Sequence, residues 1–125
     1  MTTNQVLESS PFRLKPGVDE AALLHASERM QRDFLSTQQG FVRRELIKGA
    51  EGSYTDLVWW ESFAASQAAM KKATSSHVVS AYLAVMDSSA GDPRDAVSLF
   101  SIAGSYRPRR ACSLSRSNET CRDSS

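Results

Sequence analysis

The sequence predicts a single α+β domain whose elements follow the order β-α-β-β-α-β. Two segments place apolar residues three and four positions apart, as helices do, and four short segments are rich in aromatic and β-branched residues, as strands are. No internal repeat is present. With 125 residues, 41% of them hydrophobic, the chain can bury one core, and this length excludes a multidomain enzyme.

The first strand and the first helix are predicted from residue 6 to about residue 40. Residues 6–14 form a strand, and Pro11 indicates a sheet edge or a strand end because proline cannot donate a ladder hydrogen bond. Asp19 is the expected N-cap of the helix, which stops near Gly40. One apolar stripe of this helix consists of Leu23, Ala26, Met30, Phe34 and Thr37.

The remaining elements begin with a hairpin. Phe41–Lys48 and residues 54–60 are predicted antiparallel strands around the glycine-containing turn 49–52. Ser62 is expected to cap an alanine-rich helical stretch that runs to about Lys72. A second helical stretch follows residues 74–76 and ends before Asp92-Pro93, and residues 96–106 supply the last strand.

This order is typical of the ferredoxin-like arrangement, a four-stranded antiparallel sheet with the helices on one face. The other face, roughly 300 to 350 Å² in area, would then be uncovered. In three of the strands, apolar residues occur at positions that point to either side of the sheet, which indicates burial on both faces. Trp59, opposite in parity to Trp60, is expected at such an interface. We therefore predict a homodimer joined through its sheet faces.

Charge and composition divide the chain into a body and a tail. Residues 107–125 contain five arginines against two acidic residues, and one leucine with no aromatic residue, so a disordered Arg/Ser-rich tail is predicted. Residues 1–106 form the predicted domain and carry 10 basic against 12 acidic residues. Both cysteines lie in the tail, so the fold cannot depend on a disulfide framework.

Several classes of partner are excluded by these patterns. The net charge of +1 gives no field for nucleic acid, no apolar run is long enough to span a membrane, and no export signal is expected. The two histidines lie on different predicted helices, so no metal site is expected. We expect a cytoplasmic protein without a bound cofactor.

Three stretches carry a resemblance to a known family. They are Gly-Phe-Val-Arg-Arg-Glu-Leu at 40–46, the segment 51–65 with its Trp-Trp-Glu-Ser, and Ser76-His77. On these markers residues 5–106 resemble the antibiotic-biosynthesis-monooxygenase-like group of dimeric α+β barrel proteins. The resemblance implies two sheets packed face to face into a barrel, with a small cavity between the sheet and the helices of each subunit.

The branches of that group differ in their functional residues. The haem-degrading branch uses an Asn and a Trp whose positions fall near Ser10 and Ala68, so haem degradation is disfavoured although His77 lies close to its histidine. In the cofactor-free quinol monooxygenase branch, an Asn and a Trp four residues apart line the pocket. Those positions hold Asp56 and Trp60 here, and a Tyr of that branch falls near Ser66.

Asp56 has two alternative roles on the sequence evidence. Tyr54, Asp56, Val58 and Trp60 share one strand face, and a carboxylate among apolar groups becomes more basic, as a general base requires. Alternatively, Arg43 or Arg44 on the neighbouring strand pairs with Asp56 and Trp60 is ordinary core, the hairpin register being open.

We predict, by resemblance, a cofactor-independent monooxygenase that oxidises a small aromatic or quinol-type substrate with O₂. The candidate catalytic residue is Asp56, and the candidate substrate-binding residues are Trp60, Tyr54, Arg44 and His77. The alternative is a non-catalytic homodimeric module of the same fold that binds a small ligand or serves a structural purpose.

Overall fold

The strands form one four-stranded antiparallel sheet in the order β2-β3-β1-β4. A computed structural model describes residues 4–109. The strands are β1 (Val6–Arg13), β2 (Phe41–Lys48), β3 (Ser53–Trp60) and β4 (Ser98–Ser101). In β3 every second residue is buried, so this strand has one face toward the core and one toward the opposite side.

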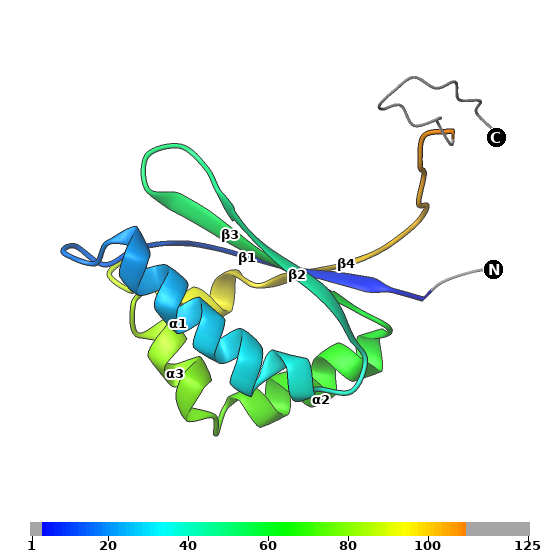
Figure 1. Ribbon diagram of the computed structural model, residues 1–125, viewed down its shortest axis with the longest axis horizontal. Coiled ribbons are helices and arrows are strands. Elements are labelled where there is room, and N and C mark those ends of the chain that lie inside the picture. The colour runs from blue at the N-terminus through cyan, green and yellow to red at the C-terminus, as the bar shows by residue number, and fades with distance from the viewer. Residues whose placement is uncertain (1–3, 110–125) are drawn as a thin grey trace, which may run out of the picture.

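The helices all lie on one face of this sheet, as Figure 1 shows. They are α1 (Glu20–Asp33), α2 (Phe63–Ala73) and α3 (His77–Leu83). The side chains of Asp19 and Ser62 accept hydrogen bonds from backbone N–H groups three residues later, so both predicted N-caps are confirmed. The ferredoxin-like fold predicted from the sequence is therefore present.

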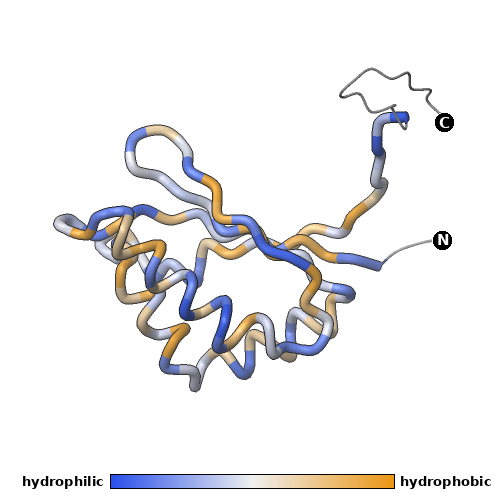
Figure 2. Tube along the Cα trace, viewed as in Figure 1, coloured by the Kyte–Doolittle hydropathy of each residue, from blue (hydrophilic) through white to orange (hydrophobic). Residues whose placement is uncertain are grey.

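The core lies between the helices and the inner face of the sheet. Leu23 of α1 is fully buried and Trp60 of β3 is 2% exposed. Figure 2 shows hydrophobic residues recurring along α1 between hydrophilic ones, as a helix with one buried face requires. Phe12 stacks on Tyr54 across the β1–β3 pair, with ring centroids 5.6 Å apart. Phe12 also contacts Tyr82 of α3 edge to face, with ring centroids 6.1 Å apart, so aromatic side chains join the sheet to a helix.

Three elements differ from their predicted extent. Helix α3 ends at Leu83 instead of continuing to Asp92-Pro93. The last strand covers Ser98–Ser101 instead of 96–106, because β4 pairs only with β1, which begins at Val6. A 3-10 helix, Pro93–Ala96, precedes it. The first helix ends at Asp33 and a separate 3-10 turn, Leu35–Thr37, completes the stretch that was predicted to be helical as far as Gly40.

Pro11 lies on β1 beyond the end of β4. β1 pairs with β3 along its whole length but with β4 only over Val6–Ser9, so one edge of β1 is unpaired at Pro11. The predicted edge position of this proline is therefore confirmed. Of the predicted tail, 107–125, residues 110–125 lie outside the described residues.

Gly40 marks a close approach between the start of β2 and helix α2. Its φ is +86°, and a Cβ atom at this position would lie 2.5 Å from the Cβ of Ala65. The carbonyl of Gly40 also accepts the N–H of Glu61 at 2.8 Å. Both the backbone conformation and the lack of space require glycine here.

The sheet face opposite the helices carries a set of partly exposed apolar side chains. Leu7 lies between Trp59 and Phe100 in the strand register, and Phe100 and Ile47 are 52% and 46% exposed. The guanidinium of Arg43 lies 3.7 Å from the centre of the Trp59 ring. No helix of residues 4–109 covers this face (Figure 1).

Candidate functional site

A pocket of about 300 Å³ lies between the inner face of the sheet and the helices. β1 and β3 form its floor, α1, α2 and α3 supply its walls, and the segment before β4 contributes Pro93, Arg94 and Val97. Most of its lining is aliphatic or aromatic, and the charged side chains in it are Glu8, Asp56 and Arg94. The volume is at the lower end of that of small-molecule sites.

Asp56 is held by three hydrogen bonds. Arg44 donates through Nε to Oδ1 at 2.8 Å and through Nη2 to Oδ2 at 3.0 Å, and the hydroxyl of Tyr82 donates to Oδ2 at 2.7 Å. The side chains of Arg44 and Asp56 are only 7% and 6% exposed. Of the alternatives left open by the sequence, the ion pair with Arg44 is the one that the structure contains.

The register explains why Arg44 and not Arg43 is the partner. Arg44 lies opposite Val58 and Leu46 opposite Asp56, so Arg44 reaches Asp56 diagonally on the inner face. Arg43 lies opposite Trp59 on the outer face and pairs with exposed Glu45 at 2.7 Å. A β-bulge between Phe41 and Arg43 shifts the pairing of β2 with β3 and so sets this register.

Burial and pairing shift the pKa values of this cluster. Burial disfavours the charge on Arg44, but the hydrogen bonds and the charge of Asp56 outweigh it, so its pKa is raised. Burial, reinforced by the charge of Asp56, raises the pKa of Tyr82 far above its usual range. Arg44 thus stays a cation and Tyr82 a neutral hydroxyl donor.

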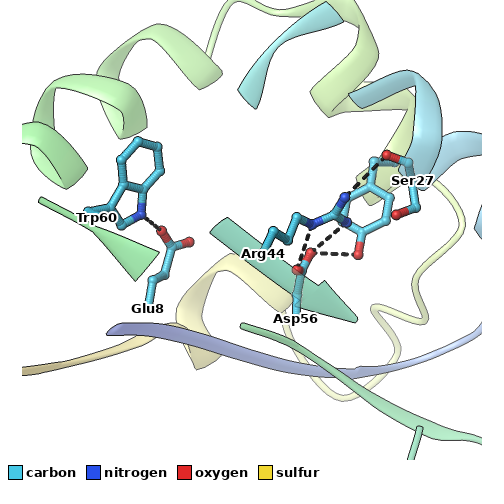
Figure 3. A network of polar contacts seen from close by, with 6 residues as sticks. Glu8, Ser27, Arg44, Asp56 and Trp60 are labelled. Carbon is cyan, nitrogen blue, oxygen red and sulfur yellow. Dashed lines mark hydrogen bonds and ion pairs between the residues drawn. The ribbon is translucent and has the colours of Figure 1, made fainter. Parts of the chain in front are cut away.

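Glu8 forms a second polar pair on the same floor. The indole N–H of Trp60 donates to Oε1 of Glu8 at 2.9 Å. Figure 3 shows this pair beside Arg44 and Asp56, both pairs directed from the sheet toward the helices. Within residues 4–109 no basic side chain forms an ion pair with Glu8. The two carboxyl groups of the pocket therefore have different surroundings.

The pKa of Glu8 is raised from its ordinary value. Burial is the largest cause, and the negative charge of Asp56 adds to it, while the hydrogen bond from Trp60 and the charge of Arg44 oppose it. A carboxyl with a raised pKa can exchange a proton nearer to neutral pH than an ordinary glutamate.

The other predicted site residues lie away from the pocket. Tyr54 is buried on the same face of β3, where its hydroxyl donates to Glu20 at 2.8 Å, but it does not line the pocket. His77 begins α3 and is exposed, also outside the pocket lining. The structure therefore brings together Asp56, Trp60 and Arg44, but neither Tyr54 nor His77.

Glu8 and Tyr82 were not among the sequence candidates. The inward face of β1 holds Val6, Glu8, Ser10 and Phe12, so strand alternation alone would have placed Glu8 with two buried residues. Tyr82 appeared in the sequence only as an apolar position of a helix, and its hydrogen bond spans 26 residues. No local pattern indicates that contact.

Two further features concern metals and membranes. Within residues 4–109, no three His, Cys, Asp or Glu side chains cluster closely enough to hold a metal ion. In the same range, no helix has the length and apolar character needed to cross a bilayer.

Solved structures with this arrangement are known. SnoaB, a cofactor-independent oxygenase from Streptomyces nogalater, superposes with a TM-score of 0.64 at 20% identity, over 82% of this chain and 97% of that one. The chain has the antibiotic-biosynthesis-monooxygenase-like fold. A putative antibiotic biosynthesis monooxygenase from Bordetella bronchiseptica gives a TM-score of 0.62 at 13% identity, over 83% and 100% of the two chains.

The same fold also occurs with other activities. The haem-degrading protein Rv3592 of Mycobacterium tuberculosis gives a TM-score of 0.53 at 16% identity, covering 86% of this chain and 100% of its own. No protein-family model and no curated protein matches the sequence. At these identities the likeness establishes the antibiotic-biosynthesis-monooxygenase-like fold and leaves activity to be argued from the pocket.

The buried ion pair predicts a large loss of stability when one partner is removed. Asp56→Ala leaves Arg44 and the Tyr82 hydroxyl without their acceptor, and we expect the free energy of unfolding to fall by about 3–5 kcal/mol. Asp56→Asn, which keeps one acceptor oxygen, should cost less. Urea unfolding measures both. Glu45→Ala, which removes the exposed partner of Arg43, is the control and should cost less than about 1 kcal/mol. Equal costs for Asp56→Ala and Glu45→Ala would contradict the structural role of the pair.

The raised pKa of Glu8 predicts a pH-dependent stability. The folded protein binds this proton more tightly than the unfolded chain, so the stabilisation is complete below pH 4.5 and is lost as the pH rises through the folded-state pKa. Glu8→Gln removes this dependence. In urea unfolding from pH 4.5 to about pH 7, the stability of Glu8→Gln relative to the wild type should therefore increase with pH. Glu45→Gln, with an exposed carboxyl, should show no such trend, and a decrease for Glu8→Gln would refute the assignment.

Proposed function

We propose that this protein oxygenates a small, electron-rich phenolic compound with O₂ in the pocket between its sheet and its helices. The observation that carries the proposal is the pocket itself, about 300 Å³ in volume and lined mainly by apolar side chains, with carboxyl groups on its floor. Trp60, Phe34 and Tyr82 supply aromatic surfaces against which a planar ring can pack. The likeness to monooxygenases supports the same reaction class.

The reaction takes its electrons from the substrate. A hydroxyarene with a ring C–H ortho or para to its hydroxyl loses the hydroxyl proton to a base. That ring carbon of the resulting phenolate adds O₂ to form a carbon–oxygen bond and a peroxide, which is then protonated. Loss of the C–H proton from the same carbon breaks the O–O bond and releases water, leaving the second carbonyl group of a quinone. One oxygen atom enters the product and the other leaves as water, so no external reductant is consumed.

The pocket provides what such a reaction needs from a protein. Its apolar walls exclude bulk water, which would otherwise protonate the anion or decompose the peroxide. A carboxylate on the floor can accept and return the proton. Asp56, the candidate base of the sequence analysis, has both oxygens bound by Arg44 and Tyr82, and this occupancy favours a structural role for it.

A second candidate function is a small-ligand-binding module without catalysis. The closed network of Asp56, Arg44 and Tyr82 favours it, because a carboxylate that is fully hydrogen-bonded organises a pocket without needing to exchange a proton. Ligand binding without O₂ uptake separates this function from the proposed one.

The first test measures O₂ uptake by purified, chelator-treated protein with a panel of hydroquinones and polycyclic hydroxyarenes, together with tryptophan fluorescence. We expect uptake above the autoxidation blank. Ala69→Leu, which places a larger side chain in the pocket wall, should bring uptake down to the blank, whereas Ala68→Leu on the exposed neighbouring position should not. Saturable fluorescence quenching without uptake would favour the binding module, and silence in both readouts would refute both functions.

We further propose that the protein is a homodimer joined through the outer face of the sheet. Leu7, Trp59 and Phe100 form a continuous apolar row across three strands. Ile47 lies on the same face of the sheet but further along β2, opposite Thr55. Burying this row removes apolar surface from water, which favours association.

Light scattering at micromolar concentration tests the dimer, with an expected mass of twice 13.7 kDa. Phe100→Glu should give the monomer mass because it introduces a charge into the apolar row. Phe63→Glu is the matched control, since Phe63 is similarly exposed, at 57%, but lies on α2 on the other side of the sheet. A monomeric wild type would refute this assembly.

A further inference from the structure

The two carboxyl groups of the pocket differ in how many of their oxygen atoms already accept a hydrogen bond. Both oxygens of Asp56 accept hydrogen bonds, three in all, from Arg44 and Tyr82. Glu8 accepts one, from the indole of Trp60 to Oε1, and within residues 4–109 its Oε2 has no donor. Oε2 of Glu8 is therefore the carboxylate oxygen of this pocket that is available to a bound molecule.

The position of Glu8 is fixed by its surroundings. It lies on β1, a strand paired with β3 along its length, and the Trp60 side chain that holds it is 2% exposed. An indole N–H is a donor only, so it orients the carboxylate without competing for its proton. A group held on a rigid strand by a buried partner keeps its geometry during a reaction.

We propose, resting on the function proposed above, that Glu8 is the catalytic base of this pocket and that it removes the proton of a phenolic hydroxyl of the substrate. The O–H bond of the phenol breaks, its electron pair stays on the substrate oxygen, and a new O–H bond forms at Oε2 of Glu8. A ring carbon of the phenolate then forms a carbon–oxygen bond with O₂, and protonated Glu8 returns the proton to the peroxide anion that results.

The charges around the pocket also define the class of substrate. Arg44 is committed to Asp56 and to the carbonyl of Ser27, to which it donates at 3.3 Å. Arg94 at the rim is exposed and paired with Asp92. Both cations at or beside the pocket are therefore already paired, and the carboxylate of Glu8 would repel a negatively charged ligand. The pocket suits a neutral hydrogen-bond donor, a polyphenol, and disfavours an aromatic carboxylate.

Several other titratable groups face Glu8. Asp56 lies on the floor of the pocket and Tyr82 on α3. Arg44 does not line the pocket but pairs with Asp56, and Arg94 lies at the rim. α1 and α2 contribute only uncharged side chains to the lining. Tyr82 and Arg44 do not change charge near neutral pH, because the pKa of each is raised above an already high value.

The test compares the wild type with Glu8→Gln in steady-state O₂ uptake with a neutral hydroquinone. Gln keeps the size of the side chain and an acceptor for the Trp60 N–H but cannot take up a proton. We expect kcat to fall by about 10²- to 10⁴-fold while KM changes little. The decrease in wild-type rate toward acidic pH should also be absent from the variant. Glu61→Gln, an exposed carboxyl beside Trp60 in the sequence, should behave like the wild type.

A chemical rescue separates a base from a merely structural residue. An electron-rich hydroxyarene that is assayed above the pKa of its own hydroxyl is already ionised and needs no base, so Glu8→Gln should then oxidise it at nearly the wild-type rate. Equal losses with the neutral and the ionised substrate would overturn the role of Glu8 as a base. Circular dichroism and urea unfolding of the variant show that the fold is retained.

The outcomes distinguish this inference from the proposed function. Uptake by the wild type and by Glu8→Gln at equal rates overturns the role of Glu8 and leaves the proposed function standing. Absence of uptake by the wild type with every substrate overturns both. Fluorescence titration adds a binding readout: the wild type should bind a hydroquinone more tightly than its dimethyl ether and than benzoate, and the reverse order would overturn the substrate class.

Discussion

The buried ion pair between Arg44 and Asp56 is the interaction on which the rest of this structure depends. It joins β2 to β3 on the inner face of the sheet, and two more hydrogen bonds extend it to α3 through Tyr82 and to α1 through the carbonyl of Ser27. Four elements that are distant in sequence therefore meet at one charged pair. Because a buried charge is costly unless it is paired, any rearrangement of these elements that separates the pair is disfavoured. The ion pair thus contributes to the uniqueness of the packing as well as to its stability.

Because of this ion pair, the two carboxyl groups of the pocket have different roles. Asp56 is neutralised by a cation and stays fixed, whereas Glu8, on the neighbouring strand, faces the pocket with an indole as its partner. Different hydrogen-bonding partners for two nearby carboxyl groups are a recurring way for a protein to assign them different tasks. A carboxylate beside an already balanced ion pair meets less repulsion than one beside a free aspartate, so Arg44 also allows Glu8 to be present.

Much of the fold could be predicted from the sequence because it depends on local signals. Asp19 and Ser62 precede helices whose first turns need an acceptor, and the alternation of β3 matches one buried face. The pairing of Arg44 with Asp56 could not be predicted, because a bulge after Phe41 sets which arginine points inward. The extent of β4 depends on where its partner β1 begins, and the contact of Tyr82 with Asp56 depends on how α3 lies over the sheet. The inward position of Glu8 could be predicted, because strand alternation places it on the same face as Val6 and Phe12.

The contact at Gly40 explains why a dipeptide can mark a fold. Helix α2 approaches the start of β2 so closely that a single methyl group at Gly40 would collide with Ala65, and the positive φ of Gly40 disfavours every other residue independently. Chains that share this crossing of strand and helix are under the same steric restriction, however different their pockets have become. The glycine of the Gly-Phe pair is therefore required by the close approach of two backbone segments. The pair carries information about the fold and none about the reaction.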